Sequence, residues 1–206
     1  MENGNSWRVI VSEESDSDTY KTLGLVIRHS NIFVNIDTIR LLFTSLVRSQ
    51  LEYASVIWAP KSELYNSILE KIQARFVRAL FKRENGFYPT YPNAISYKQL
   101  AENLDLESLK SRREYNYLML LYNIMNNKID IPSAMDYISI RVPIIGLRQR
   151  EDPLFFSPGE AHQSPTYRDS TLPTAMALFN KHNSALDFAD KENIFKQKCK
   201  SFLYHT

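Results

Sequence analysis

The feature that most constrains the fold is the long run from Asn31 to Ala59, which contains neither glycine nor proline. Polar side chains recur along it every four residues, at Arg40, Thr44, Arg48 and Glu52. This spacing follows the turn of an α-helix, so the run predicts one long, well-buried helix with a single polar stripe. Asp37 is a suitable N-cap, and Pro60 should end the helix at Ala59, because proline lacks an N–H and disfavours helical geometry in the residue before it.

A second amphipathic helix is predicted from Ser62, which can cap its first turn, to about Arg83. Its apolar side chains fall on one side at helical spacing, namely Tyr65, Ile68, Leu69, Ile72, Phe76 and Leu80. Two antiparallel helices joined at Pro60 would bury their apolar faces together, with Trp58 as an anchor at the hinge end. The first half of the chain therefore predicts a helical hairpin.

Further helices are predicted over residues 96–103 and 108–129, because the chain has only 5 glycines and they leave long uninterrupted segments. Beyond Pro132, prolines, glycines and short β-branched runs favour extended segments and turns. One or two closing helices are expected after residue 170, with Phe188, Phe195 and Phe202 as apolar anchors. The expected fold class is a mainly α helical bundle with an irregular, proline-containing C-terminal region.

Three segments are expected from the composition along the chain. Residues 1–20 carry several acids and serines against one arginine, which is typical of a solvated, disordered tail. Residues 21–130 form the helical region, and residues 131–206 form the irregular segment with the C-terminal helices. No segment approaches the roughly 18 apolar residues of a membrane span. With a single cysteine, Cys199, an internal disulfide is excluded, so we expect an intracellular protein, cytoplasmic or nuclear, with no membrane partner.

The motifs of most enzyme classes are absent from the sequence. There is no P-loop, no Gly-x-Gly-x-x-Gly turn and no nucleophile elbow. The histidines are scattered without ligand spacing, at His29, His162, His182 and His205. Cys199 fits a small buried hydrophobe in a terminal helix. We therefore expect no catalytic residues, no bound metal and no cofactor in this chain.

Local basic charge is the remaining functional signal. On the second predicted helix four cations are spaced by four, three and four residues: Lys71, Arg75, Arg78 and Lys82. This spacing places them in one row on the helix, where a nucleic-acid backbone would meet them together. Lys110, Arg112 and Arg113 on a later helix add to the basic charge. A solvated helix face is the alternative explanation, because surface helices often carry such residues. The net charge of +2 is too small to decide between the two.

Several segments resemble, in order, the region that follows the palm of non-LTR, LINE-type and Jockey-like retrotransposon reverse transcriptases. They are "TLGLVIRHSNIF" (22–33), "LLFTSLVRSQLEYASVIWAP" (41–60), "ILEKIQARFVRALF" (68–81) and "LDLESLKSRREYNYLMLLYNIMNNKID" (104–130). Two later segments, "VPIIGLRQREDPLFF" and "SPTYRDSTLPTAMALFN", resemble the more variable C-terminal part of that family. The resemblance spans residues 21–202.

The resemblance implies a thumb-like helical region of an RNA-directed DNA polymerase that grips primer and template. It implies that Tyr53, Trp58 and Pro60 form the structural junction before the basic helix, and that the partner is RNA or an RNA/DNA primer-template. The family binds catalytic Mg²⁺ through a Tyr-x-Asp-Asp turn, but this sequence has no Asp-Asp pair. We therefore expect a non-catalytic, C-terminal fragment that neither polymerises nor cleaves nucleic acid; Mg²⁺ is expected only in a full-length polymerase.

The predicted nucleic-acid contacts are Lys71, Arg75, Arg78 and Lys82, followed by Arg112 and Arg113. The alternative function is a helical protein-interaction module, in which apolar surface left by the absent palm binds that palm or another protein. A decayed transposon copy without a selected function is a third possibility.

Overall fold

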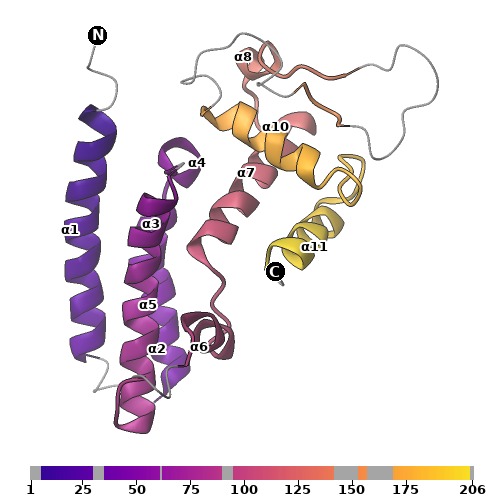
Figure 1. Ribbon diagram of the computed structural model, residues 1–206. Helices are drawn as coiled ribbons and strands as arrows, with labels where there is room; N and C mark the ends of the chain where they lie inside the picture. Colours follow the sequence, from indigo (N-terminus) through magenta and orange to yellow (C-terminus); the bar gives the residue numbers. More distant parts are fainter. Residues whose placement is uncertain are drawn as a thin grey trace. The chain divides into compact units, whose positions relative to one another are not determined.

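The computed structural model describes residues 6–29, 35–60, 62–89, 95–141, 153–156 and 169–204, with side chains from residue 18 onward. The described chain is mainly helical, which confirms the predicted mainly α class (Figure 1). Most of the predicted irregular, proline-containing segment, residues 142–152 and 157–168, lies outside the described residues. It divides into two compact units, Met1–Lys110 and Ser111–Thr206. The division falls in the first turn of a helix, some 20 residues before the boundary predicted at residue 130, because the start of that helix packs with the first unit.

The first unit begins with helix α1, Ser6–His29, where a disordered tail was predicted over residues 1–20. From Thr19 onward one side of this helix is buried, including Leu23 and Val26. α1 packs against the helices described next, so its last turns belong to the core of the unit (Figure 1). The tail prediction is wrong from Ser6, where α1 begins, because an acidic composition reports overall polarity and does not exclude a helix.

The long helix predicted up to Ala59 consists of four segments and is interrupted once, at Tyr53 and Ala54. The segments are α2 (Ile36–Leu42), the π-helical η2 (Phe43–Arg48), α3 (Ser49–Glu52) and α4 (Ser55–Trp58). The N-cap is Asn35, whose side chain accepts a hydrogen bond from the N–H of Asp37, the residue predicted to be the cap. The helix stops before Pro60 as predicted, with Ala59 outside helical geometry at φ −50° and ψ 129°.

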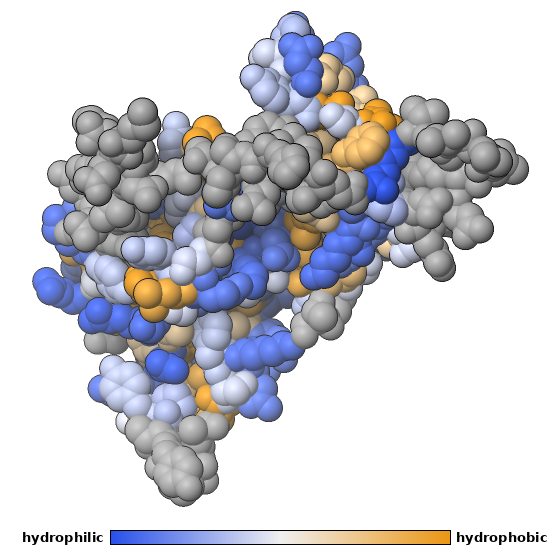
Figure 2. Space-filling view, turned by 45° about the horizontal axis from the view of Figure 1, so that its top comes forward, coloured by the Kyte–Doolittle hydropathy of each residue, from blue (hydrophilic) through white to orange (hydrophobic). Residues whose placement is uncertain are grey.

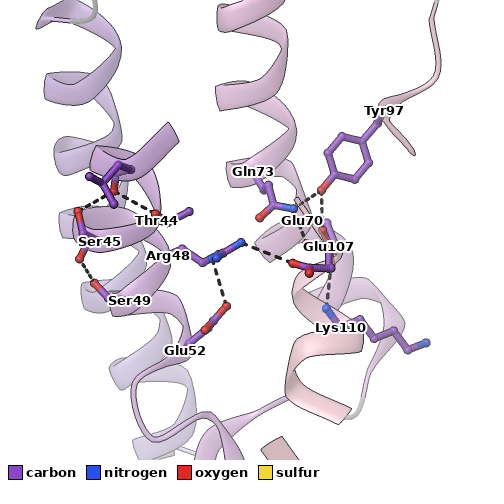
Figure 3. Close-up of polar contacts among 11 residues, drawn as sticks. Thr44, Ser45, Arg48, Ser49, Glu52, Glu70, Gln73, Tyr97, Glu107 and Lys110 are labelled. Atoms are coloured by element: carbon purple, nitrogen blue, oxygen red, sulfur yellow. Dashed lines mark hydrogen bonds and ion pairs between the residues drawn. The ribbon is translucent and has the colours of Figure 1, made fainter. Parts of the chain in front are cut away.

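Two local features accompany the departure from one regular helix. In and just after η2, side-chain hydroxyls donate back to carbonyls of the preceding turn: Ser45 to Leu41 at 2.7 Å, and Ser49, the first residue of α3, to Ser45 at 2.5 Å (Figure 3). Such bonds compete with the regular ladder and bend helices. Between α3 and α4, Ala54 adopts a left-handed conformation with φ 49°. The carbonyl of the preceding residue, Tyr53, then accepts a hydrogen bond from the Trp58 indole N–H at 2.6 Å.

Helix α5, Glu63–Asn85, is the central helix of the first unit. Ser62 caps it as predicted, and Gly86 ends it in a left-handed conformation with φ 79°. The predicted apolar face is buried at Leu69, Ile72, Phe76 and Leu80, whereas Tyr65 is exposed. Phe76 stacks on Phe43 of η2, with 3.9 Å between ring centroids, so the predicted pairing of the two apolar faces exists despite the broken first helix.

The short helix α6, Tyr97–Asn103, and the first residues of α7, Leu109–Met125, complete the first unit. Helix α6 starts with a capping box in which Ser96 and Gln99 each bond the other's backbone N–H. It matches the helix predicted over residues 96–103. After a turn, α7 begins, and its first residue is fully buried in the core of the first unit.

The second unit contains the rest of α7, then α8 (Pro132–Met135), α10 (Thr171–Lys181) and α11 (Glu192–Leu203). Two closing helices are therefore present. The predicted anchors Phe195 and Phe188 lie in an aromatic cluster with Phe155 and Phe179, and Phe202 stacks on His182. Cys199 is buried as predicted, and burial raises the pKa of its thiol to about 12. Among the described helices none is both long and apolar enough to cross a bilayer.

Candidate nucleic-acid interface

The four predicted cations form one exposed row on α5. Lys71, Arg75, Arg78 and Lys82 are all exposed. With 3.6 residues per helical turn, their spacing confines them to an arc of about 60°. The buried positions of α5, including Phe76 and Leu80, centre on the opposite side of the helix. We call these four residues the basic stripe.

The carboxylates of α5 point away from the basic stripe. Glu63 forms an ion pair with the Lys110 ammonium at 2.6 Å. Glu70 accepts hydrogen bonds from the Lys110 backbone N–H and from the Tyr97 hydroxyl, both at 3.0 Å. Glu84, the third acid of the helix, lies about 200° around it from Lys82. The acids of α5 therefore leave the stripe uncompensated.

Across all the residues that the structure describes, no carboxylate forms an ion pair with the stripe. Instead, its members neighbour one another at helical spacing: Lys71 with Arg75, Arg75 with Arg78, and Arg78 with Lys82. Like charges at these spacings destabilise a helix by about 0.2–0.5 kcal/mol per pair. The like charges of the stripe therefore lower the stability of α5, and a bound anion would relieve this repulsion.

A buried polar network fixes the other side of α5 (Figure 3). The Gln73 side-chain amide, with no exposed surface, donates to the Tyr97 hydroxyl at 2.8 Å and to the Glu107 carbonyl at 2.9 Å. The Tyr97 hydroxyl donates in turn to Glu70. Burial, followed by the nearby Glu70 charge, raises the pKa of Tyr97 far above its ordinary value, so the hydroxyl keeps its proton. The network joins α5 to α6 and to the start of α7, and it holds the basic stripe outward.

Arg48 of η2 extends this network from the broken first helix (Figure 3). Its guanidinium lies 3.6 Å from Glu52 and 3.9 Å from Glu107. Arg48 and Glu52 were predicted as part of a polar stripe, and they are indeed adjacent, but the stripe faces the turn between α6 and α7, where Arg40 donates to the Leu104 carbonyl at 3.1 Å. Gln73 was not singled out in the sequence, because a glutamine among apolar positions gives no signal until its partners are placed.

The cations predicted on α7 do not form a second row like the basic stripe. Arg113 is 3% exposed, so its guanidinium lies inside the protein, and this burial argues against the predicted phosphate contact of this residue. Arg112 is partly buried. Both belong to the second unit, whereas Lys110 belongs to the first and bonds Glu63.

The predicted junction is only partly packed. Trp58 packs against the core of the first unit, and the Pro60 carbonyl accepts a hydrogen bond from Asn66 of α5 at 3.4 Å. Tyr53, however, is 80% exposed, so it does not pack the joint. The left-handed residue Ala54 turns the chain here, and it is the Tyr53 carbonyl, not its ring, that holds Trp58.

The described residues contain no group of three or more histidine, cysteine or acidic side chains placed to hold a metal ion. A small pocket of about 200 Å³ lies at Ile36, Leu80, Arg83 and Glu84. Pockets for small ligands usually measure about 300–1,000 Å³, so this one is too small for a nucleotide. The basic stripe is an open helix face, which suits an extended polymer better than an enclosed molecule.

Figure 2 shows that hydrophilic side chains surround separate apolar patches on the face in view. In the first unit, several large apolar side chains are exposed, including Leu41, Ile57 and Leu64. Comparison with known proteins adds no identification: the chain matches no family model, no curated protein and no solved structure.

Proposed function

We propose that the chain is a non-catalytic, thumb-like helical region of a non-LTR retrotransposon reverse transcriptase, which binds the backbone of RNA or of an RNA/DNA primer-template through the basic stripe. One observation carries the proposal: four exposed cations share one face of α5, while every acid of that helix points elsewhere. A helix face that merely needs solvation usually intersperses both signs of charge.

The length of the stripe fits a run of phosphates. From Lys71 to Lys82 the helix rises about 16 Å, at 1.5 Å per residue. One strand of a duplex presents a phosphate about every 3.4 Å along its axis, so a strand that follows the stripe would place about five phosphates within reach. Phosphate contacts carry no base information, and the binding should therefore depend on salt and hardly on sequence.

The test is fluorescence anisotropy of a labelled RNA/DNA primer-template at several salt concentrations. We expect log-linear loss of affinity with salt. In the variant Lys71→Gln/Arg75→Gln/Arg78→Gln, the slope should become shallower by about two to three units, since each lost phosphate contact contributes about 0.7–0.9. Lys82 is kept, because its ammonium lies over the Tyr88 ring and supports the end of the helix.

The matched control is Lys181→Gln/Lys191→Gln/Lys200→Gln. These three lysines are exposed in the second unit, and either variant changes the net charge from +2 to 2 − 3 = −1. The control should keep the wild-type affinity and slope if position matters. Equal losses in both variants would mean that net charge alone drives binding, and the stripe would then not be a site.

A protein-interaction module is the second candidate function. It is favoured by three apolar side chains near α4 and the start of α5: Tyr53, Ile57 and Leu64 are 80%, 73% and 65% exposed. Sedimentation velocity measures self-association of the chain directly. Concentration-dependent self-association that Ile57→Ser/Leu64→Ser abolishes, together with salt-independent anisotropy, would favour this candidate over nucleic-acid binding.

A further inference from the structure

The C-terminal end of α5 brings two aromatic side chains to the end of the basic stripe. Gly86 adopts a left-handed conformation, and its N–H bonds the Lys82 carbonyl at 2.8 Å. This turn reverses the chain just after the helix, so that the next two residues, Phe87 and Tyr88, lie beside the last helical turn. The Lys82 ammonium lies 4.4 Å from the centroid of the Tyr88 ring.

Both aromatic rings are held in place yet remain open to solvent. Phe87 makes an edge-to-face contact with Phe81, with 5.7 Å between centroids and 86° between ring planes. Despite these contacts, Phe87 is 57% exposed and Tyr88 is 49% exposed. Exposing two adjacent aromatic rings to water is unfavourable. Neither the Lys82–Tyr88 contact nor the Phe81–Phe87 contact requires the rings to be exposed. Rings that are fixed and exposed beside a cation form a surface on which a flat, unsaturated ring can stack.

We propose that Phe87 and Tyr88 form a stacking platform for one or two unpaired bases of a single-stranded RNA or DNA whose phosphates follow the basic stripe. The inference rests on the proposed function of the stripe and names the form of its ligand. Lys82 links the two parts, because its ammonium lies against the Tyr88 ring and within the row that meets the phosphates.

Duplex nucleic acid cannot use this platform in the same way. In a duplex the faces of each base are covered by the neighbouring base pairs, whereas an unpaired base can be splayed out and stacked on an aromatic side chain. Stacking is worth about fivefold to hundredfold in affinity per base, from alanine substitutions in other single-strand binders. The stripe alone would bind both forms, and the platform adds a preference for unpaired nucleotides.

The test compares a labelled single strand of about 12 nucleotides, within the usual site sizes, with the same strand annealed to its complement. Anisotropy titrations of the full chain are made at one fixed salt concentration. Phe87→Leu/Tyr88→Leu keeps apolar volume but removes both rings. We expect its affinity for the single strand to fall at least about fivefold, while its affinity for the duplex and its salt slope stay at the wild-type values.

Two further variants guard against an effect on folding. Tyr88→Leu alone keeps the Phe81–Phe87 contact, and Tyr88→Phe keeps the ring and should retain single-strand affinity. Tyr65→Leu is the matched control. Tyr65 is 50% exposed on α5, the helix that carries the basic stripe, but lies about 110° around that helix from the centre of the stripe. Circular dichroism checks that each variant has wild-type helix content.

The outcomes separate the two proposals. Selective loss of single-strand affinity supports the platform. Equal loss for both ligands, no loss, or the same loss in Tyr65→Leu overturns the platform while leaving the stripe as a backbone site. If the wild-type chain shows no salt-dependent binding to either ligand, the proposed function falls and the platform falls with it.

Discussion

Helices α5 and α11 carry similar basic side chains but handle their charge differently. On α11, Lys196 pairs with Glu192 of the preceding turn, and Lys198 pairs with Asp190 just before the helix. Glu192 also binds Lys128, which follows α7. On α5, Glu63 and Glu70 bond Lys110 at the start of α7 and leave the basic stripe uncompensated.

The difference teaches that the position of acids, more than the number of cations, separates a solvated helix face from a candidate anion site. Charges that already have partners on their own surface gain little from an external phosphate, since they must first give up an ion pair. A row of like charges is destabilising until a ligand neutralises it. The predictions that follow test this contrast, beginning with the largest effect.

Removing a buried aromatic ring from α5 or from α11 should disrupt the packing of that helix alone. Phe76 and Phe195 are fully buried, Phe76 on α5 and Phe195 on α11, where Phe195 lies 4.4 Å from the Tyr122 ring. Phe76→Ala and Phe195→Ala should each lower the free energy of unfolding by about 3–5 kcal/mol. Urea titration followed by circular dichroism measures the loss. Of the two variants, only Phe76→Ala should lose nucleic-acid binding at a lower urea concentration than the wild type. The same early loss of binding in Phe195→Ala would show that the two units unfold together.

The polar contacts behind the two helices should differ in strength. The Tyr97 hydroxyl donates to the Glu70 carboxylate, whereas the Tyr122 hydroxyl donates to the neutral Asp190 carbonyl at 2.8 Å. Hydrogen bonds to charged groups are worth about 1.5–3 kcal/mol, and neutral ones about 0.5–1.5 kcal/mol. Tyr97→Phe should therefore destabilise more than Tyr122→Phe in the same urea titration. Equal effects would mean that the network behind α5 does not depend on the Glu70 charge.

Removing cations should have opposite effects on the two helices. Lys71→Gln/Arg75→Gln/Arg78→Gln removes three like-charge neighbours and should raise the free energy of unfolding by about 0.6–1.5 kcal/mol. Lys196→Gln removes an ion pair and should lower it slightly or leave it unchanged. Thermal unfolding at low salt measures both. A stripe variant less stable than wild type would show that the cations help the fold, and the contrast with α11 would fail.

The smallest expected effect is a pH dependence on the α11 side. Hydrogen bonds from Lys128 and Lys196 lower the pKa of Glu192 to about 2, below its ordinary value of 4.5. A carboxyl whose pKa is depressed in the fold stabilises it above the unfolded pKa and loses that contribution as pH falls from about 4.5 toward 2. Glu192→Gln should remove this part of the acid-induced fall in melting temperature, and because Glu192 is exposed the change should be small. Identical pH profiles would show that the ion pairs do not hold in solution.

Much of the helical architecture was predictable from local signals. Ser62 and Ser96 each cap a helix at the predicted place, and Pro60 follows the end of one, because caps and proline act on neighbouring backbone groups. The row of Lys71 to Lys82 was equally predictable, since helical spacing alone sets which residues share a face. The separation of buried from exposed residues around α5 follows from the same periodicity, except that Tyr65, predicted on the apolar face, is exposed.

The breaks and the burial of charges needed the tertiary structure. A local pattern predicted one continuous α-helix to Ala59, but the helix takes the π form in η2 and is interrupted by the left-handed Ala54. The arginine pair on α7 was predicted as a surface feature, yet Arg113 is buried. Residues 1–20 were predicted as a tail, yet a helix starts at Ser6. The burial of Arg113 shows packing that overrides a local preference, whereas the interruption at Ala54 is a local turn that no sequence pattern announces.

The sequence by itself determined which residues of this protein could act together on one helix face, because the geometry of a helix depends only on neighbours along the chain. Only the tertiary structure decided whether that face is available. It turned Glu63 and Glu70 toward the start of α7, buried Gln73 behind the helix, and placed Phe87 and Tyr88 beside Lys82. These contacts join residues far apart in the chain or across a turn, and their energies depend on partners that no local pattern names.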